Sequence, residues 1–172
     1  RFALGGRVAL VTGASQGIGR AAARRLVEEG AAVCAVAAPA DRADLEEAVE
    51  ELVGLGGRAV GLAGDVAEPE TAEQAVELAV RSFGRLDYLL SNAGIFARED
   101  PLEAAVDQLD RLLAVNVRGN YLMSVRAARA MAGQGGGAIV ITASTAALLG
   151  DESMAAYNAS KAAAAQLARS LA

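Results

Sequence analysis

The stretch 12–19, TGASQGIG, decides the fold because it joins an apolar run, 7–11 (RVALV), to an amphipathic run, 17–29. Its glycines allow a tight turn and allow a pyrophosphate to approach the amides at the start of a helix. A plain strand-to-helix turn uses glycines in the same way, so the surrounding pattern decides what the motif means. In this context the stretch predicts the first strand, turn and helix of an α/β chain.

Apolar and amphipathic runs alternate along the rest of the chain. The apolar runs predict five strands, at 7–11, 32–37, 59–63, 86–90 and 138–142. The amphipathic runs predict helices at 17–29, 41–53, 69–83, 107–132 and from about 154 onward. Strands separated by helices pair in parallel through right-handed crossovers. We therefore predict one α/β domain over 1–172, a Rossmann-type doubly wound parallel sheet with helices on both faces.

Composition excludes several classes of function. The formal net charge is −5 and no basic run is present, so we expect no nucleic-acid surface. No apolar run approaches the roughly 20 residues of a membrane span, so we expect no membrane partner. The single cysteine, Cys34, lies in a predicted strand, which favours a buried thiol and a reducing cytoplasm. The absence of histidine excludes Ser-His-Asp triads and most metal sites, so we expect no metal.

Polar and small residues follow two of the predicted strands. Asp65 and Val66 come after the third strand, and 91–94 (SNAG) comes after the fourth. Ligands bind at the carboxyl ends of strands in open α/β sheets. Each motif alone could be an ordinary turn or cap. Together with the glycine turn, they predict a nucleotide site along this edge of the sheet.

A tyrosine and a lysine open the last predicted helix, in 157–161 (YNASK). Residues four apart share a helix face, so Tyr157 and Lys161 project together. An ammonium favours the ionised form of a nearby phenol, which makes tyrosine a usable proton donor and acceptor in a chain without histidine. Ser144, just past the fifth strand, can offer a hydroxyl to a substrate oxygen. Taken alone, the tyrosine and lysine could equally be an exposed surface pair.

These motifs together resemble those of the short-chain dehydrogenase/reductase family. TGASQGIG is similar to the family's TGxxxGxG, and SNAG to its NNAG with Ser91 in place of the first Asn. The run 116–119 (NVRG) is similar to NxxG, and YNASK fits YxxxK. The motifs occur in the family's order and cover essentially all 172 residues. The resemblance implies an oxidoreductase that transfers a hydride between NAD(P)(H) and a small alcohol or ketone.

The resemblance also implies a role for each candidate residue. Tyr157 would exchange a proton with the substrate, and Lys161 would assist it and bind the nicotinamide ribose. Ser144 would hold the substrate oxygen, and Asn116 would position a water in a proton relay. The implied cofactor-binding residues lie in the glycine turn and after the strands, and are Gly13, Ser15, Gln16, Gly17, Ile18, Gly19, Ala37, Asp65, Val66, Asn92, Ala93, Gly94, Tyr157 and Lys161.

The choice between NAD and NADP stays open at this stage. Family members that prefer NAD usually carry an acid at the end of the second strand, where this chain has Ala37. Ala38 and Gln16 stand where basic residues would indicate NADP. Asp41 and Arg42 lie slightly downstream and could serve either cofactor.

The ends of the chain suggest a piece of a longer protein. The chain begins with Arg1 and stops at Ala172 inside a helical pattern, so we expect truncation at both ends. Relatives continue with two more strands and a loop that closes over substrate, so we expect the fifth strand to be an exposed edge. Relatives also commonly form homodimers or homotetramers through the fourth and last helices, and the resemblance implies the same for the full-length protein.

Two other classes of protein remain alternatives. The first is an NAD(P)-binding regulator of the same fold without catalytic activity, which has no need of a phenol and an ammonium on one helix face. The second is another Rossmann-type binder, such as a methyltransferase. That alternative explains the glycine turn but neither YNASK nor its spacing from Ser144.

Overall fold

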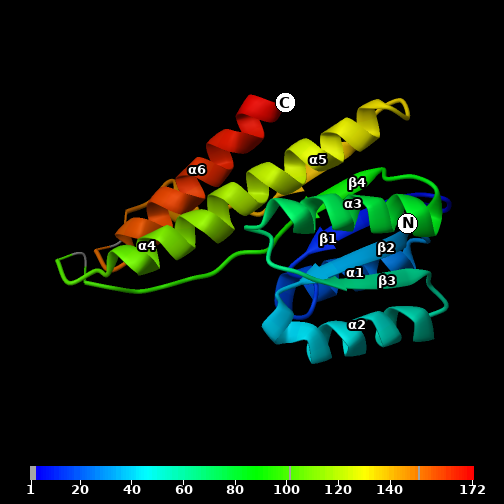
Figure 1. Cartoon of the computed structure of the whole chain (residues 1–172), viewed down its shortest axis with the longest axis horizontal. Coiled ribbons are helices and arrows are strands. Elements are labelled where there is room, and N and C mark those ends of the chain that lie inside the picture. The colour runs from blue at the N-terminus through cyan, green and yellow to red at the C-terminus, as the bar shows by residue number, and fades with distance from the viewer. Residues whose placement is uncertain (1–2, 101, 151) are drawn as a thin grey trace.

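Parallel strands form the central sheet of the computed structural model, which describes residues 3–100, 102–150 and 152–172 (Figure 1). Within these residues the strands are β1 (Val8–Thr12), β2 (Ala32–Ala37), β3 (Ala59–Ala63), β4 (Tyr88–Ser91) and β5 (Ala138–Ile141). Their order is β3-β2-β1-β4-β5, and every neighbouring pair is parallel. From β1 the chain first adds strands on one side, β2 and β3, and then on the other side, β4 and β5. This change of direction creates a crevice at the carboxyl ends of β1 and β4. The predicted fold class is confirmed.

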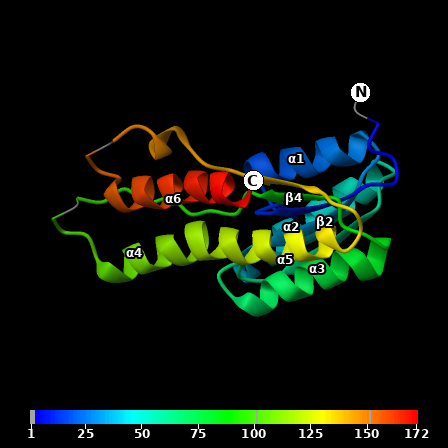
Figure 2. The same ribbon diagram turned by 90° about the horizontal axis from the view of Figure 1, so that it is seen from above.

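Helices cover both faces of this sheet, as Figures 1 and 2 show. They are α1 (Gly17–Glu28), α2 (Arg42–Gly54), α3 (Pro69–Phe83), α4 (Val106–Leu113), α5 (Asn120–Ala132) and α6 (Ala155–Leu171). Two short 3₁₀ turns, Pro39–Asp41 and Thr145–Ala147, follow β2 and precede α6. The helix termini follow the sequence signals closely, since Pro69 opens α3 and left-handed Gly84 closes it.

Alternate residues of the central strands face two separate apolar clusters. Cys34 of β2 packs with α3 and α5, whereas Val33 and Ala35 pack with α1 and α2. This alternation is what a sheet buried on both faces requires. Burial raises the pKa of the Cys34 thiol to about 12, so the group is a core residue. At the edge of the sheet, Val140 of β5 is 58% exposed, which agrees with the expected open edge.

The fourth strand begins at Tyr88, two residues later than the apolar pattern predicts. The Asp87 N–H donates to the Val8 carbonyl at 2.9 Å, and the Asp87 carboxylate accepts the N–H of Val8 at 2.9 Å. Burial alone would raise the pKa of Asp87, but the guanidinium groups of Arg85 and Arg7 hold it below its ordinary value. The other strand boundaries differ from prediction by at most one residue, as is usual at element ends.

The predicted long helix 107–132 is wrong as a single regular helix. A π-helical segment, Ala114–Gly119, separates α4 from α5. A π segment inserts an extra residue into a turn and changes the direction in which its side chains point. Asn116 lies at its centre and is fully buried. The interruption therefore turns a polar side chain toward the core, next to the start of α6.

The described residues give no support for a membrane span or a metal centre. None of their helices combines the length and apolar character needed to cross a bilayer. Among the same residues, no three potential metal ligands gather at one point.

Candidate active site

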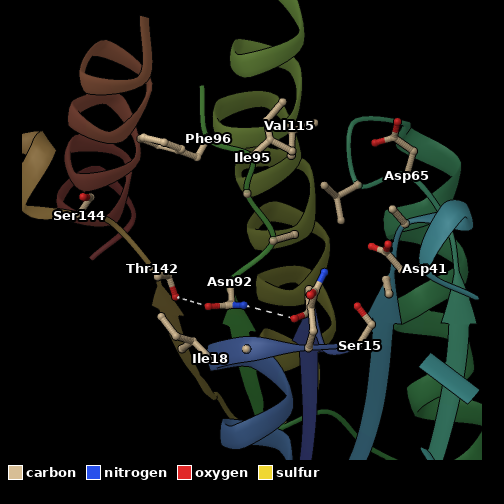
Figure 3. A pocket seen from close by; sticks show the side chains of 18 of the residues that line it. Ser15, Ile18, Asp41, Asp65, Asn92, Ile95, Phe96, Val115, Thr142 and Ser144 are labelled. Atoms are coloured by element: carbon tan, nitrogen blue, oxygen red, sulfur yellow. Dashed lines mark hydrogen bonds between the residues drawn. The ribbon is translucent and has the colours of Figure 1, made fainter. Parts of the chain in front are cut away.

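A cleft of about 580 Å³ runs along the carboxyl ends of the strands. Figure 3 shows Ser144 and Thr142 at one end of this cleft and Asp41 and Asp65 at the other. Most of the residues predicted for the site line it: Gly13, Ser15, Gln16, Gly17, Ile18, Ala37, Asp65, Val66, Asn92, Ala93, Gly94, Ser144, Tyr157 and Lys161. Gly19 and Asn116 do not line the cleft. Both lie beneath it.

The glycine turn brings the start of α1 to the cleft. Gly13 has a φ of +66°, a conformation that residues with a Cβ rarely adopt. Gly19 sits against the turn itself, because a Cβ there would overlap the carbonyl of Gly13 and lie 2.8 Å from Asn92 Nδ2. No side chain caps α1, and its first turn contains no acid. Its first N–H groups are therefore not neutralised locally and suit an anion such as a pyrophosphate.

Hydrogen bonds between strand ends form the floor of the cleft. The buried Thr12 hydroxyl accepts the N–H groups of Asn92 and Ala93 at 2.9 and 3.0 Å. The Asn92 side chain then joins two strands, because it donates to the Gly13 carbonyl at 3.4 Å and accepts the Thr142 hydroxyl at 3.1 Å (Figure 3). The sequence analysis did not identify Thr12 or Thr142 as site residues. Their positions at the ends of two predicted strands were the available signal.

Asp65 is held by two groups at the far end of the cleft. Its carboxylate accepts the Ala67 N–H at 3.0 Å and pairs with Arg111 at 2.8 Å. Partial burial would raise the pKa of Asp65, but the Ala67 N–H and Arg111 together keep it below its ordinary value. Arg111 also lines the cleft and was not identified from the sequence. Asp65 therefore neutralises most of the positive charge of Arg111.

Asp41 and Arg42 separate at the same end of the cleft. Asp41 closes the 3₁₀ turn after β2 and lines the cleft next to Ala37 and Ala38, as Figure 3 shows for Asp41. Arg42 begins α2 and lines a different hollow, between α2 and β3. The sequence alone did not indicate which of the two residues lines the cleft.

Tyr157, Lys161 and Ser144 share the other end of the cleft. Lys161 Nζ lies 5.9 Å from the centre of the Tyr157 ring, and the two side chains come from one face of α6. The Tyr157 ring also meets Phe96 edge to face, with centroids 4.9 Å apart. Burial lowers the pKa of Lys161. A hydroxyl, a phenol and an ammonium therefore line the same cleft.

Asn116 connects this end of the cleft to the core. Its side-chain oxygen accepts the Ile95 N–H at 2.8 Å, and its Nδ2 donates to the Ile95 carbonyl at 2.9 Å and to Ser160 Oγ at 3.0 Å. These bonds use both donors of the amide. The side chain therefore fixes the segment after β4 against α6, and it has no N–H left for a ligand.

Comparison with known proteins gives relatives along nearly the whole chain. L-rhamnose 1-dehydrogenase (NAD(P)(+)) of Sphingomonas sp. (strain SKA58) is 44% identical over 160 residues, which make up 92% of this chain and 63% of the relative. D-threitol dehydrogenase of Mycolicibacterium smegmatis is 39% identical over 160 residues, 93% of this chain and 61% of the relative. The chain therefore spans less than two thirds of the length of these curated relatives.

Solved structures agree closely with the fold. A short chain dehydrogenase/reductase from Burkholderia phymatum in complex with NAD superposes with a TM-score of 0.95 at 32% identity, covering 99% of this chain and 60% of that chain. NAD⁺-bound xylitol dehydrogenase gives a TM-score of 0.91 at 38% identity, covering 95% of this chain and 63% of that chain. The family model for short chain dehydrogenases matches residues 7–172. This chain belongs to the short chain dehydrogenase family.

Proposed function

We propose that this chain forms the cofactor-binding and catalytic part of an NAD(P)-dependent oxidoreductase that interconverts an alcohol and its carbonyl compound. The observation that supports this most directly is the position of Tyr157, Lys161 and Ser144 in the same cleft as the uncapped start of α1. A regulator that only binds a nucleotide has no use for this group of side chains. Relatives whose names include NAD(P) or that were solved with NAD support the same cofactor class.

The residues of the cleft fit a dinucleotide. The start of α1 offers N–H donors for the pyrophosphate. Gly13 and Gly19 let the turn close against Asn92, and Gly17 leaves open space where a Cβ would stand. Ile18 is 70% exposed at the mouth of the cleft and gives an apolar surface for a ring. When bound, the nicotinamide accepts or returns the hydride.

The side chains of the chain itself handle the proton. In the direction of alcohol oxidation, the ionised oxygen of Tyr157 would accept the proton of the substrate hydroxyl. Ser144 donates its hydroxyl hydrogen to the substrate oxygen, and Lys161 favours the ionised form of the phenol. In the reverse direction, Tyr157 returns the proton to the carbonyl oxygen. Positioning of these groups supplies much of the rate.

NAD is the favoured cofactor. Asp41 lines the end of the cleft beside Ala37 and Ala38, and a carboxylate there can accept a hydrogen bond from a ribose 2′-hydroxyl but repels a 2′-phosphate. The cations among the lining residues are Arg111, which is paired with Asp65, and Lys161, which is bonded to the Thr142 carbonyl. Thr142 lies at the opposite end of the cleft from Asp41 (Figure 3). Among the described lining residues, the Asp41 end of the cleft thus offers no unpaired cation for a 2′-phosphate.

A homodimer or homotetramer is the proposed assembly of the full-length protein. A groove between α4, the π segment and α6 is lined by apolar side chains, among them Leu113, Val117 and Leu167, and by charged side chains of α4. Tyr121 beside them is 51% exposed. Light scattering should give the mass of two or four copies, and a monomer would contradict this assembly.

The test of the enzymatic proposal is Tyr157→Phe in the full-length protein. Fluorescence titration should give a Kd for NADH within about threefold of wild type, because only the hydroxyl is removed. Turnover should fall by about a hundredfold or more. Substrates to try first are L-rhamnose, D-threitol, xylitol and cyclohexanol, which appear in the names of relatives. Equal turnover in variant and wild type would reject Tyr157 as the acid, and NADH binding without any turnover in wild type would favour the regulator.

A further inference from the structure

A chain of buried hydrogen bonds runs from the sheet to the turn of α6 that contains Tyr157. Ser91 Oγ at the end of β4 donates to Asn120 Oδ1 at 2.6 Å, and Asn120 Nδ2 donates to the Asn116 carbonyl at 2.5 Å. Asn116 Nδ2 donates to Ser160 Oγ at 3.0 Å, and Ser160 Oγ donates to the Tyr157 carbonyl at 2.8 Å. Every donor in this chain points from the sheet toward α6.

The four polar side chains of this chain are almost completely inaccessible to solvent. Ser91, Asn116, Asn120 and Ser160 are each 3% exposed or less. Buried polar groups without partners are strongly disfavoured, so each bond constrains the next. The Asn116 carbonyl can only accept, so the nitrogen end of the Asn120 amide must face it. The oxygen end therefore faces Ser91, whose hydroxyl donates to it and holds the amide in place.

The Asn120 side chain takes over the Asn116 carbonyl at the end of the π segment. In a regular α-helix the backbone N–H of Asn120 would donate to that carbonyl. Here the backbone N–H of Asn120 donates to Val117, and the side chain donates to Asn116. Asn120 thus holds the Asn116 carbonyl at the junction between the π segment and α5.

Asn116 in turn lies against the catalytic end of the cleft. A Cβ placed on Gly94 would be 3.1 Å from both Asn116 Oδ1 and Lys161 Nζ, so these two groups flank the Gly94 backbone. Asn116 also makes both bonds to Ile95 described above. A displaced Asn116 would therefore disturb the segment that borders the cleft and the surroundings of Lys161 together.

We propose that Asn120, held by its bond to Ser91, is a positioning residue that fixes Asn116 and through it the Tyr157–Lys161 pair. This inference rests on the proposed function. Asn120 does not line the cleft and makes no direct contribution to cofactor binding. Its loss should therefore lower kcat and leave the KM for NAD almost unchanged.

The experiment compares Asn120→Val with Asn120→Thr in the full-length protein. The two side chains have nearly the same shape, but the threonine hydroxyl can donate to the carbonyl four residues earlier, which here is Asn116. We expect kcat to fall about tenfold in the valine variant, since small displacements of catalytic groups are costly. The threonine variant should recover most of the activity. The KM for NAD should stay within about twofold in both, as expected for an effect on transition-state geometry alone.

Ser91→Ala removes a single hydroxyl and provides a second test if the valine variant does not fold. It should lower kcat in the same direction, again with an unchanged KM for NAD. Equal kcat in wild type and in the folded variants would overturn the inference and leave the proposed function intact. A loss of kcat that threonine fails to recover would also contradict it, because the lost feature would then be amide shape and not the donated bond. If wild type binds NADH and turns over no substrate, the proposed function fails first and this inference fails with it.

Discussion

Lys161 Nζ donates a hydrogen bond to the Thr142 carbonyl oxygen 3.1 Å away. This bond joins α6 to the residue that follows β5, and Lys161 is only 4% exposed. An ammonium has three donors, so the remaining hydrogens are free to serve groups that enter the cleft. The position of the charge is therefore fixed by the backbone and does not depend on a ligand.

Replacing Lys161 by Met should change the pH dependence of stability. Because burial lowers the pKa of Lys161 below its ordinary 10.5, the unfolded chain binds more protons than the folded chain between the two values. The contribution of Lys161 to the free energy of unfolding of the wild type therefore rises as the pH is raised from the lowered pKa toward 10.5. Thermal melts of both proteins should show Tm of the variant minus Tm of wild type falling as the pH is raised toward 10.5. A difference that is constant with pH would contradict the burial of a charged lysine.

Gly19→Ala should damage the glycine turn. The added Cβ would overlap the Gly13 carbonyl and crowd Asn92, so the turn or α1 must shift. We expect a loss of about 1–3 kcal/mol in the free energy of unfolding, as for overpacked cores. NADH binding should weaken by at least about tenfold because the start of α1 moves, an effect worth about 1.4 kcal/mol. Urea denaturation and fluorescence titration measure the two effects.

Gly54→Ala is the matched control for that substitution. Gly54 ends α2, has open space around its Cβ position and does not line the cleft. Alanine is the better helix former, so stability should stay equal or rise by up to about 1 kcal/mol. NADH binding should be unchanged. Similar losses in both variants would show that the close approach at Gly19 has no special importance.

Thr12 provides a test of the floor of the cleft. Thr12→Val keeps the shape of the side chain but leaves the N–H groups of Asn92 and Ala93 without their acceptor. We expect a loss of about 1–3 kcal/mol in the free energy of unfolding, the usual cost of an unsatisfied buried group. Thr12→Ser retains the hydroxyl and should lose less. Chemical denaturation of the pair measures the difference, and a valine variant as stable as the serine variant would argue against these bonds.

The order of strands and helices could be read from the sequence because its signals are local. The apolar run before TGASQGIG, the glycine after α3 and the proline at its start each act within a few residues. The parallel sheet follows from their alternation. The π segment could not be read in this way. It depends on how the buried Asn116 packs against Ile95 and Ser160, which lie 21 and 44 residues away.

The residues of the candidate site could largely be predicted from the sequence, but the hydrogen bonds that join them could not. The motifs identified many of the residues that line the cleft, because short motifs at strand ends and helix starts occupy one edge of the sheet. The bonds among them join distant residues, such as Asn92 with Thr142, 50 positions apart. Ser91 stands in place of the first Asn of the family's NNAG motif, and the motif does not indicate which residue it bonds. Its partner, Asn120, is 29 residues away and only the fold brings them together.

Asp41→Ala tests the proposed preference for NAD. Removing the carboxylate takes away an acceptor for the ribose 2′-hydroxyl and the repulsion of a 2′-phosphate, both at the end of the cleft that contains Ala37 and Ala38. The ratio of kcat/KM for NAD to kcat/KM for NADP should fall by about tenfold, which corresponds to about 1.4 kcal/mol. Arg42→Ala is the control, because Arg42 lies on α2 and lines a different hollow. Its ratio should stay within about twofold of wild type. If the arginine variant lost NADP activity while the Asp41 variant kept its ratio, Arg42 would be the residue that selects the cofactor and the assignment of Asp41 would be wrong.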